Sequence, residues 1–319
     1  MVRKLAKAKS ESLLAGLRQL GRFFRLDHKV VRELVSETIT KWNLDNAPRI
    51  GAAIAFYTIF SLTPLLVVIV AVAGLAFGPE AAAGQIVWQI EDLVGRSGAE
   101  VIESLLASAH YRPRAGIIAS VLGLLTIFFG ASRAIAELRD ALNTIWGVLP
   151  DPTESAVHSV MVLLKERFFS FLLLLGVGAL LLVSLLLNAW VSVLGRYFHE
   201  FLPTSEAVLQ LINFGVFFVV ITLLFAATYK FVPDVEISWA DVMVGAAATS
   251  LLFGIGKFVI GLYLGKSGIG SAYGASGSLV VLLVWIYYSA QVFLLGAEFT
   301  QVYANRFGTG LRAKKRLAL

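Results

Sequence analysis

The sequence contains no cysteine among its 319 residues and only four histidines. Disulfides and thiolate metal sites are therefore excluded. No HxH or HExxH metal motif is present, and the sequence also lacks the GxxxxGK[ST] phosphate loop, the GxSxG nucleophile elbow and the selectivity sequence of potassium channels. We therefore expect no metal, no cofactor, no ATP-driven motor and no enzymatic activity. The four histidines are well separated in the sequence: His28, His110, His158 and His199.

Charge is scarce as well. Only 15% of the residues are charged, 58% are hydrophobic, and the mean hydropathy is +0.79. Soluble domains are about half apolar and about one quarter charged. The formal charge of +6 would suggest nucleic acid in a soluble protein, but in a membrane protein the positions of the charges matter more than their sum. We expect an integral membrane protein with no nucleic-acid partner.

Six stretches are long and apolar enough to cross a bilayer, because a span needs about 20 mainly apolar residues. They cover residues 51–77, 115–134, 168–194, 208–231, 241–264 and 278–302. The alternation of apolar and polar residues that marks membrane strands is missing, so the spans are helices. The predicted fold is all-α, a polytopic membrane helix bundle with about six transmembrane helices.

Lysine and arginine are concentrated before the first span and in the tail, which places both termini in the cytoplasm and favours an even number of spans. The predicted organisation has three parts. Residues 1–48 form cytoplasmic, basic, amphipathic helices, residues 49–305 form the six-helix transmembrane domain, and residues 306–319 form a basic cytoplasmic tail.

Several segments outside the spans have amphipathic patterns. Arg18, Arg22 and Arg25 share one helical face, which is typical of a helix lying on an anionic leaflet. The alternative is a solvated helix packed on the bundle. A similar pattern covers 30–42, and two short amphipathic helices are expected on the outer surface within 85–110. We expect anionic lipids at the cytoplasmic face as partners, and a homo-oligomer is compatible with the sequence.

Charges inside spans are costly, so each is a functional candidate. Lys257 shares its helix face with Ser250, Gly254 and Gly261, and these small residues leave room for a neighbouring helix or for a cavity. The alternative is that Lys257 extends its ammonium group towards the outer end of its helix, about 10 Å away at 1.5 Å per residue.

The last span carries a polar stripe, because Tyr287, Gln291, Glu298 and Gln301 fall within one narrow arc. This stripe should face protein or water. The topology places Arg133, Arg139 and Asn143 at the same inner face as Glu298. Either a structural ion-pair network or a site for an anionic headgroup fits these residues.

Two backbone features predict mobility. Pro64 stands inside the first span, where it removes a helix hydrogen bond and favours a kink, although kinks are also common in bundles that do not move. The segment from Gly265 through Gly274 to Gly277 reads GKSGIGSAYGASG. Its glycines are compatible with a re-entrant or gating segment, but a flexible outer loop is the favoured interpretation.

Four fragments occur in an order and spacing that resemble the YihY/virulence factor BrkB family over most of residues 30–305. They are AAIAFYT at 52–58, followed by Ser61 and Pro64; LRDALNTIW at 138–146; YKFVPD at 229–234; and the run from YG at 273 through WIYY at 285–288 to GAE at 296–298. The resemblance implies a bacterial inner-membrane protein of six spans. Part of the family has carried the label ribonuclease BN, but that activity needs a zinc-binding cluster of histidine and aspartate, which this sequence lacks.

The resemblance also makes lipid or lipopolysaccharide export worth considering, because other family members have been linked to it. The leading hypothesis is an inner-membrane transporter or flippase-like protein for an amphipathic or anionic solute, such as a lipid. In it Arg133 and Arg139 bind an anionic group, Glu298 orients them, and Lys257 offers a second positive stop. The alternative is a non-transporting scaffold or envelope-assembly factor, and a membrane-bound nuclease is a distant third.

Overall fold

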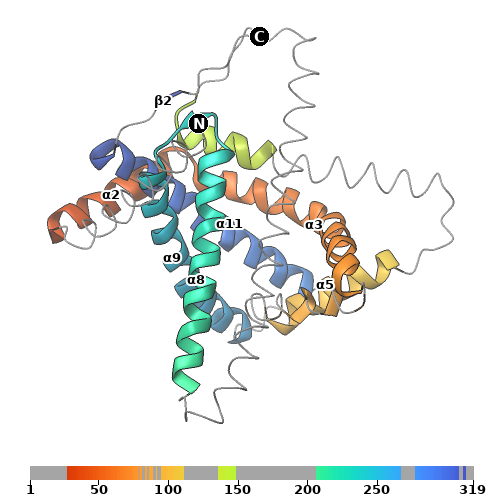
Figure 1. Ribbon diagram of the computed structural model, residues 1–319. Coiled ribbons are helices and arrows are strands. Elements are labelled where there is room, and N and C mark those ends of the chain that lie inside the picture. Colours follow the sequence, from red (N-terminus) through yellow and green to blue (C-terminus); the bar gives the residue numbers. More distant parts are fainter. Residues whose placement is uncertain are drawn as a thin grey trace, which may run out of the picture. The chain divides into compact units, whose positions relative to one another are not determined.

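The computed structural model describes residues 27–78, 80, 83–84, 86–88, 91, 95–110, 136–148, 206–266, 277–308 and 312–313. This part of the chain is almost entirely helical (Figure 1). The labelled helices are α2 (His28–Leu44), α3 (Ala47–Phe77), α5 (Arg96–His110), α8 (Glu206–Phe231), α9 (Trp239–Lys266) and α11 (Gly277–Phe307). Two strands of two residues each, β1 (Val235–Glu236) and β2 (Arg312–Ala313), pair antiparallel.

Three helices in the described part of the chain are long and apolar enough to cross a membrane. They are Phe214–Phe231, Trp239–Tyr263 and Gly277–Phe307. These helices match the fourth, fifth and sixth predicted spans. The first predicted span falls on α3, where Ala47–Leu62 forms a shorter apolar helix. The second and third predicted spans lie outside the described residues, so the number six stays a prediction.

The chain divides into two compact units. The first unit comprises residues 1–45, 142–252 and 295–319, and the second comprises 46–141 and 253–294. The first unit contains α2, α8, the beginning of α9 and the end of α11. The second contains α3, α5, the rest of α9 and the beginning of α11.

Very close helix packing characterises the first unit. A Cβ atom added to Gly245 of α9 would lie 1.8 Å from Thr300 Oγ1 of α11, and one added to Gly296 of α11 would lie 2.0 Å from Thr249 Oγ1. The Thr249 hydroxyl is also 3.2 Å from the hydroxyl of Tyr229 on α8. Small residues bring membrane helices together in this way, since lipid supplies little hydrophobic force between them. The α8 ribbon accordingly lies beside the beginning of α9 (Figure 1).

The second unit is built around α3. Leu66 of α3, Ile102 of α5 and Leu282 of α11 are buried together in one apolar cluster. The amphipathic helix α5 confirms part of the prediction for 85–110, and residues 86–88 and 91 are helical as well. Pro64 lies inside α3, and the ribbon of this helix changes direction along its length (Figure 1). Its contribution to mobility stays a prediction.

Candidate functional site

The candidate site begins on the buried face of α2. Leu34 and Thr38 are buried on this helix, and the spacing continues to Lys41 and Asp45. Residues three or four apart share one helix face, so the sequence places these two charged groups in line with the buried positions. The chain then turns sharply at Asn46, which adopts a left-handed φ of 53° that asparagine tolerates. This turn ends α2 beside Asp45.

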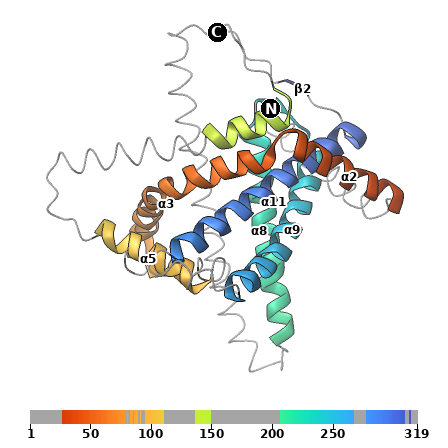
Figure 2. The ribbon, with the colours of Figure 1, turned by 180° about the vertical axis from the view of Figure 1, so that it is seen from behind.

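Gln301 of α11 links two other segments of the first unit. Lys41 Nζ donates a hydrogen bond of 2.7 Å to Gln301 Oε1, and Gln301 Nε2 donates to the carbonyl of Ile145, at the end of the helix 136–145. Both polar atoms of the Gln301 amide are therefore used. Arg306, further along α11, forms an exposed ion pair with Glu33 of α2. The ribbons accordingly place α2 beside the C-terminal end of α11 (Figures 1 and 2).

Glu298 lies one helical turn before Gln301 and has no exposed surface at all. Neither of its carboxylate oxygens has a hydrogen-bond donor in the described part of the chain. Two charged groups of α2 act on it, the Asp45 carboxylate and the Lys41 ammonium, and the Asp45 carboxyl is close enough to share a hydrogen bond with Glu298 when one of the two acids carries a proton. We call Lys41, Asp45, Glu298 and Gln301 the Glu298 cluster. A buried acid without a donor is rare because it loses its hydration without compensation.

A second polar contact in the first unit lies outside this cluster. Asn143 Nδ2 donates 2.9 Å to Asp234 Oδ2, and the Asp234 backbone N–H donates 2.9 Å back to Asn143 Oδ1. Lys230 donates to the Ile237 carbonyl and lies 5.9 Å from the centre of the Trp239 ring. Asn143 therefore uses both ends of its amide to hold the turn after α8. Its predicted contact with a substrate stays a prediction.

Two residues of the polar stripe of the last span, Glu298 and Gln301, are buried. Besides Glu298 and Gln301, Gln291 points its amide nitrogen at the Pro48 carbonyl, 3.5 Å away, in the second unit. Tyr287 differs, since 36% of its surface is exposed. The stripe thus faces protein at three of its four positions.

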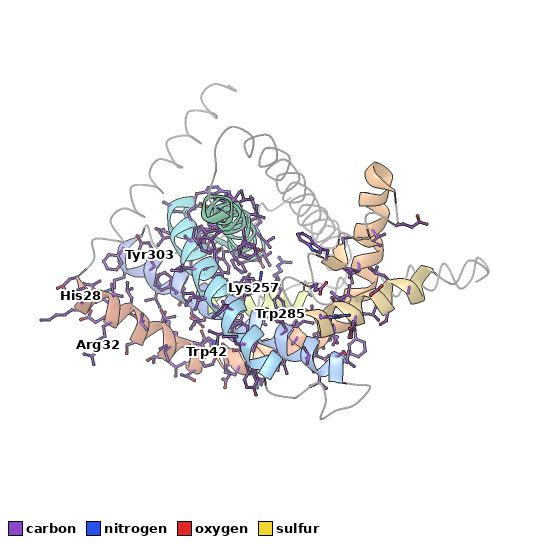
Figure 3. All side chains as sticks on the ribbon, turned by 90° about the horizontal axis from the view of Figure 1, so that it is seen from below. His28, Arg32, Trp42, Lys257, Trp285 and Tyr303 are labelled. Atoms are coloured by element: carbon purple, nitrogen blue, oxygen red, sulfur yellow. The ribbon has the colours of Figure 1, made fainter. Side chains whose placement is uncertain are left out.

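The remaining predicted site residues stay predictions. Lys257 is half-buried on α9 and belongs to the second unit, as does the half-buried Arg139 (Figure 3 labels Lys257). Arg133 and Gly274 lie outside the described residues. Gly265 is in the last turn of α9 and Gly277 begins α11, while residues 267–276 between them lie outside the described part.

Sequence reasoning missed the two partners of Glu298. It placed Lys41 in a surface helix and did not single out Asp45. The available signal was the spacing of Leu34, Thr38, Lys41 and Asp45, which puts both charges on the face that α2 buries. The predicted pairing of Glu298 with Arg133 or Arg139 stays a prediction.

Metal ligands do not gather in the described ranges, where no three histidine, aspartate or glutamate residues are placed to hold an ion. The chemistry available at the Glu298 cluster is that of a carboxyl pair, an ammonium group and an amide. These groups bind protons, cations or polar headgroups.

The family model described as virulence factor BrkB matches residues 38–318. The putative ribonuclease-like protein YfkH of Bacillus subtilis is 23% identical over 276 residues, which cover 85% of this chain and 95% of that protein. A UPF0761 membrane protein of Tolumonas auensis is 29% identical, over 61% of each chain. Another from Halorhodospira halophila is 27% identical over 86% of this chain and 58% of its own length. No solved structure matches the sequence.

Proposed function

We propose, from the premise that this chain belongs to the virulence factor BrkB family, that it is a bacterial inner-membrane transporter or flippase-like protein. Its cargo in this proposal is an amphipathic or anionic solute, such as a lipid. One observation carries the proposal: the last span buries Glu298 and Gln301 among apolar residues. Polar groups at such positions cost free energy on insertion, roughly 2.5 to 3.5 kcal/mol for a charge near a helix centre, and commonly mark pathways for ions or substrates.

The surface of α2 supports lipid as a partner. Val31, Val35 and Ile39 repeat every fourth residue and are exposed, while Leu34 faces the interior. Basic side chains accompany this apolar stripe, and the labelled Arg32 projects from α2 away from the ribbon (Figure 3). A helix with an exposed apolar stripe and basic neighbours fits the interface of an anionic leaflet. We therefore propose contact between α2 and anionic lipid at the cytoplasmic face.

A non-transporting scaffold is the second candidate, and the packing of α9 against α11 favours it. Gly245 and Gly296 bring these helices so close that little sliding between them is available. The name ribonuclease-like is that of the Bacillus relative, and we do not propose nuclease activity here. The buried polar groups favour transport, because a scaffold has no use for a buried acid that lacks a hydrogen-bond donor.

Transport is tested in proteoliposomes that contain the full-length protein and fluorescent lipids of anionic or zwitterionic headgroup. We expect the protein to move anionic lipid between leaflets faster than protein-free liposomes do, and Glu298→Gln to lower that rate. Glu37→Gln, at an exposed position of α2, is the matched control and should keep the wild-type rate. Equal rates with and without protein for every lipid would leave the scaffold as the better proposal.

Orientation is tested with single thiols, because the protein has no native cysteine. We expect a cysteine replacing Ala313, in β2, to react with an impermeant maleimide only after the inner membrane is permeabilised. A cysteine replacing Ser276, which lies outside the described residues, should react in intact spheroplasts. The reverse pattern at either position would contradict the cytoplasmic placement of the C-terminus or the even span count.

A further inference from the structure

The Glu298 cluster combines features that structural ion pairs do not share. Glu298 is fully buried, and neither carboxylate oxygen has a donor in the described part of the chain. Its neighbour Asp45 is a second acid rather than a base. Asp45 also lies at the C-terminal end of α2, where the helix dipole is negative. A second acid therefore lies beside an acid that is buried from solvent.

Lys41, the cation that acts on Glu298, forms no hydrogen bond with the Glu298 carboxylate. Lys41 Nζ directs a hydrogen bond of 2.7 Å at Gln301 Oε1, and the other end of that amide is held by the Ile145 carbonyl. The ammonium is thus fixed by a contact to the amide rather than to the carboxylate. It acts on Glu298 only through space.

We propose that Glu298 is a proton-binding site, which takes up a proton from the cytoplasmic side, with Asp45 and Lys41 of α2 beside it. The step is balanced. Hydronium donates its proton to one Glu298 oxygen, an O–H bond forms there, and water leaves. The cluster then holds one carboxylic acid, one carboxylate and one ammonium group, so the two remaining charges cancel.

A proton fits this cluster better than a metal cation. An alkali ion needs several oxygen ligands around it, whereas the described contacts commit the Gln301 and Ile145 oxygens to nitrogen donors. The fixed ammonium of Lys41 would also repel a second fixed cation. Tyr229 of α8 is another titratable group close to this part of α11, and its hydroxyl is paired with Thr249 and packs at Gly296.

Proton binding at Glu298 is inferred from its full burial, its lack of a donor and the two charged groups of α2 that act on it, whereas its use to drive transport rests on the function proposed above. A carboxyl that alternates between acid and carboxylate can bias a membrane helix between two positions, because only the neutral form tolerates full burial. The Glu298 cluster would then couple the cytoplasmic end of α11 to the proton gradient. The two statements can therefore fail separately.

Infrared difference spectroscopy of the full-length protein in nanodiscs, between about pH 5 and pH 9, tests the site. We expect a carbonyl band of a protonated, poorly hydrated carboxylic acid that disappears as the pH rises. Glu298→Gln should abolish this band, and the control Glu37→Gln should keep it. Asp45→Asn should move its midpoint to lower pH, because it removes a neighbouring negative charge.

Three results would overturn the proposal. The first is that the wild-type protein shows no such band, and the second is that the band persists in a folded Glu298→Gln protein. The third is that Asp45→Asn leaves the pH midpoint of the band unchanged while added Na⁺ changes the band. If the Glu298→Gln protein does not fold, the shift of the midpoint in the Asp45→Asn protein still tests the proposal. If the band behaves as expected but the protein moves no lipid, the proton site is supported and the proposed transport function is rejected.

Discussion

Replacing Gly245 by alanine should destabilise the folded protein by about 1 to 3 kcal/mol, a large effect for a single methyl group. The added Cβ atom would lie 1.8 Å from Thr300 Oγ1 and 2.6 Å from Thr300 Cβ. Threonine is short and branched at Cβ, so it cannot rotate away, and the backbones of α9 and α11 must separate. The midpoint of thermal unfolding in detergent, followed by circular dichroism, measures this loss.

The chain offers a matched control on the same helix. A Cβ atom added to Gly254 meets no atom within 4 Å, so Gly254→Ala should leave the stability unchanged or raise it by up to about 1 kcal/mol through helix propensity. The double variant Gly245→Ala/Thr300→Gly exchanges large and small residues and should recover part of the loss. Equal effects at Gly245 and Gly254 would show that close packing does not hold α9 against α11.

Much of the secondary structure follows from the sequence, because burial in lipid and helix periodicity are local properties. The fourth, fifth and sixth predicted spans coincide with long apolar helices, and α2 and α5 follow their amphipathic patterns. The close approach at Gly245 and Gly296 was not predicted. Some glycines in the spans touch a neighbouring helix, and others, such as Gly254, have no atom near the place of a Cβ. No local feature of the sequence distinguishes the two kinds.

For the candidate site, too, the sequence predicts local features and not the contacts between distant segments. The stripe containing Gln291, Glu298 and Gln301 is a property of one helix, and its burial follows from the cost of exposing polar groups to lipid. The partners of the stripe are not local. Sequence reasoning looked for arginine to match Glu298, whereas the charged groups that act on it come from the last turn of α2, more than 250 residues earlier in the chain.

Lys41→Met should lower the stability by about 1.5 to 3 kcal/mol, the range for hydrogen bonds that involve a charged group. The change removes the donor to Gln301 and also the positive charge that acts on Glu298. Lys29→Met, at an exposed position of the same helix, is the matched control and should have almost no effect. Adding Gln301→Leu to Lys41→Met should cost less than the sum of the two single losses, because both remove the same contact.

Glu298→Gln separates the proton site from the arginine pair that the sequence predicts. If Glu298 forms a buried pair with Arg139 or Arg133, Glu298→Gln leaves the arginine charge uncompensated. The free energy of unfolding then falls by about 3 to 5 kcal/mol when burial is complete, and changing that arginine to glutamine as well restores part of the loss. If Glu298 binds a proton, glutamine imitates its neutral form in size and charge. At low pH we therefore expect the free energy of unfolding of Glu298→Gln to lie within about 1 kcal/mol of the wild-type value. The effects of the arginine changes should then add to that of Glu298→Gln. Non-additivity between Glu298→Gln and Arg139→Gln, with a large loss in the first, would instead favour the arginine pair and an anion site.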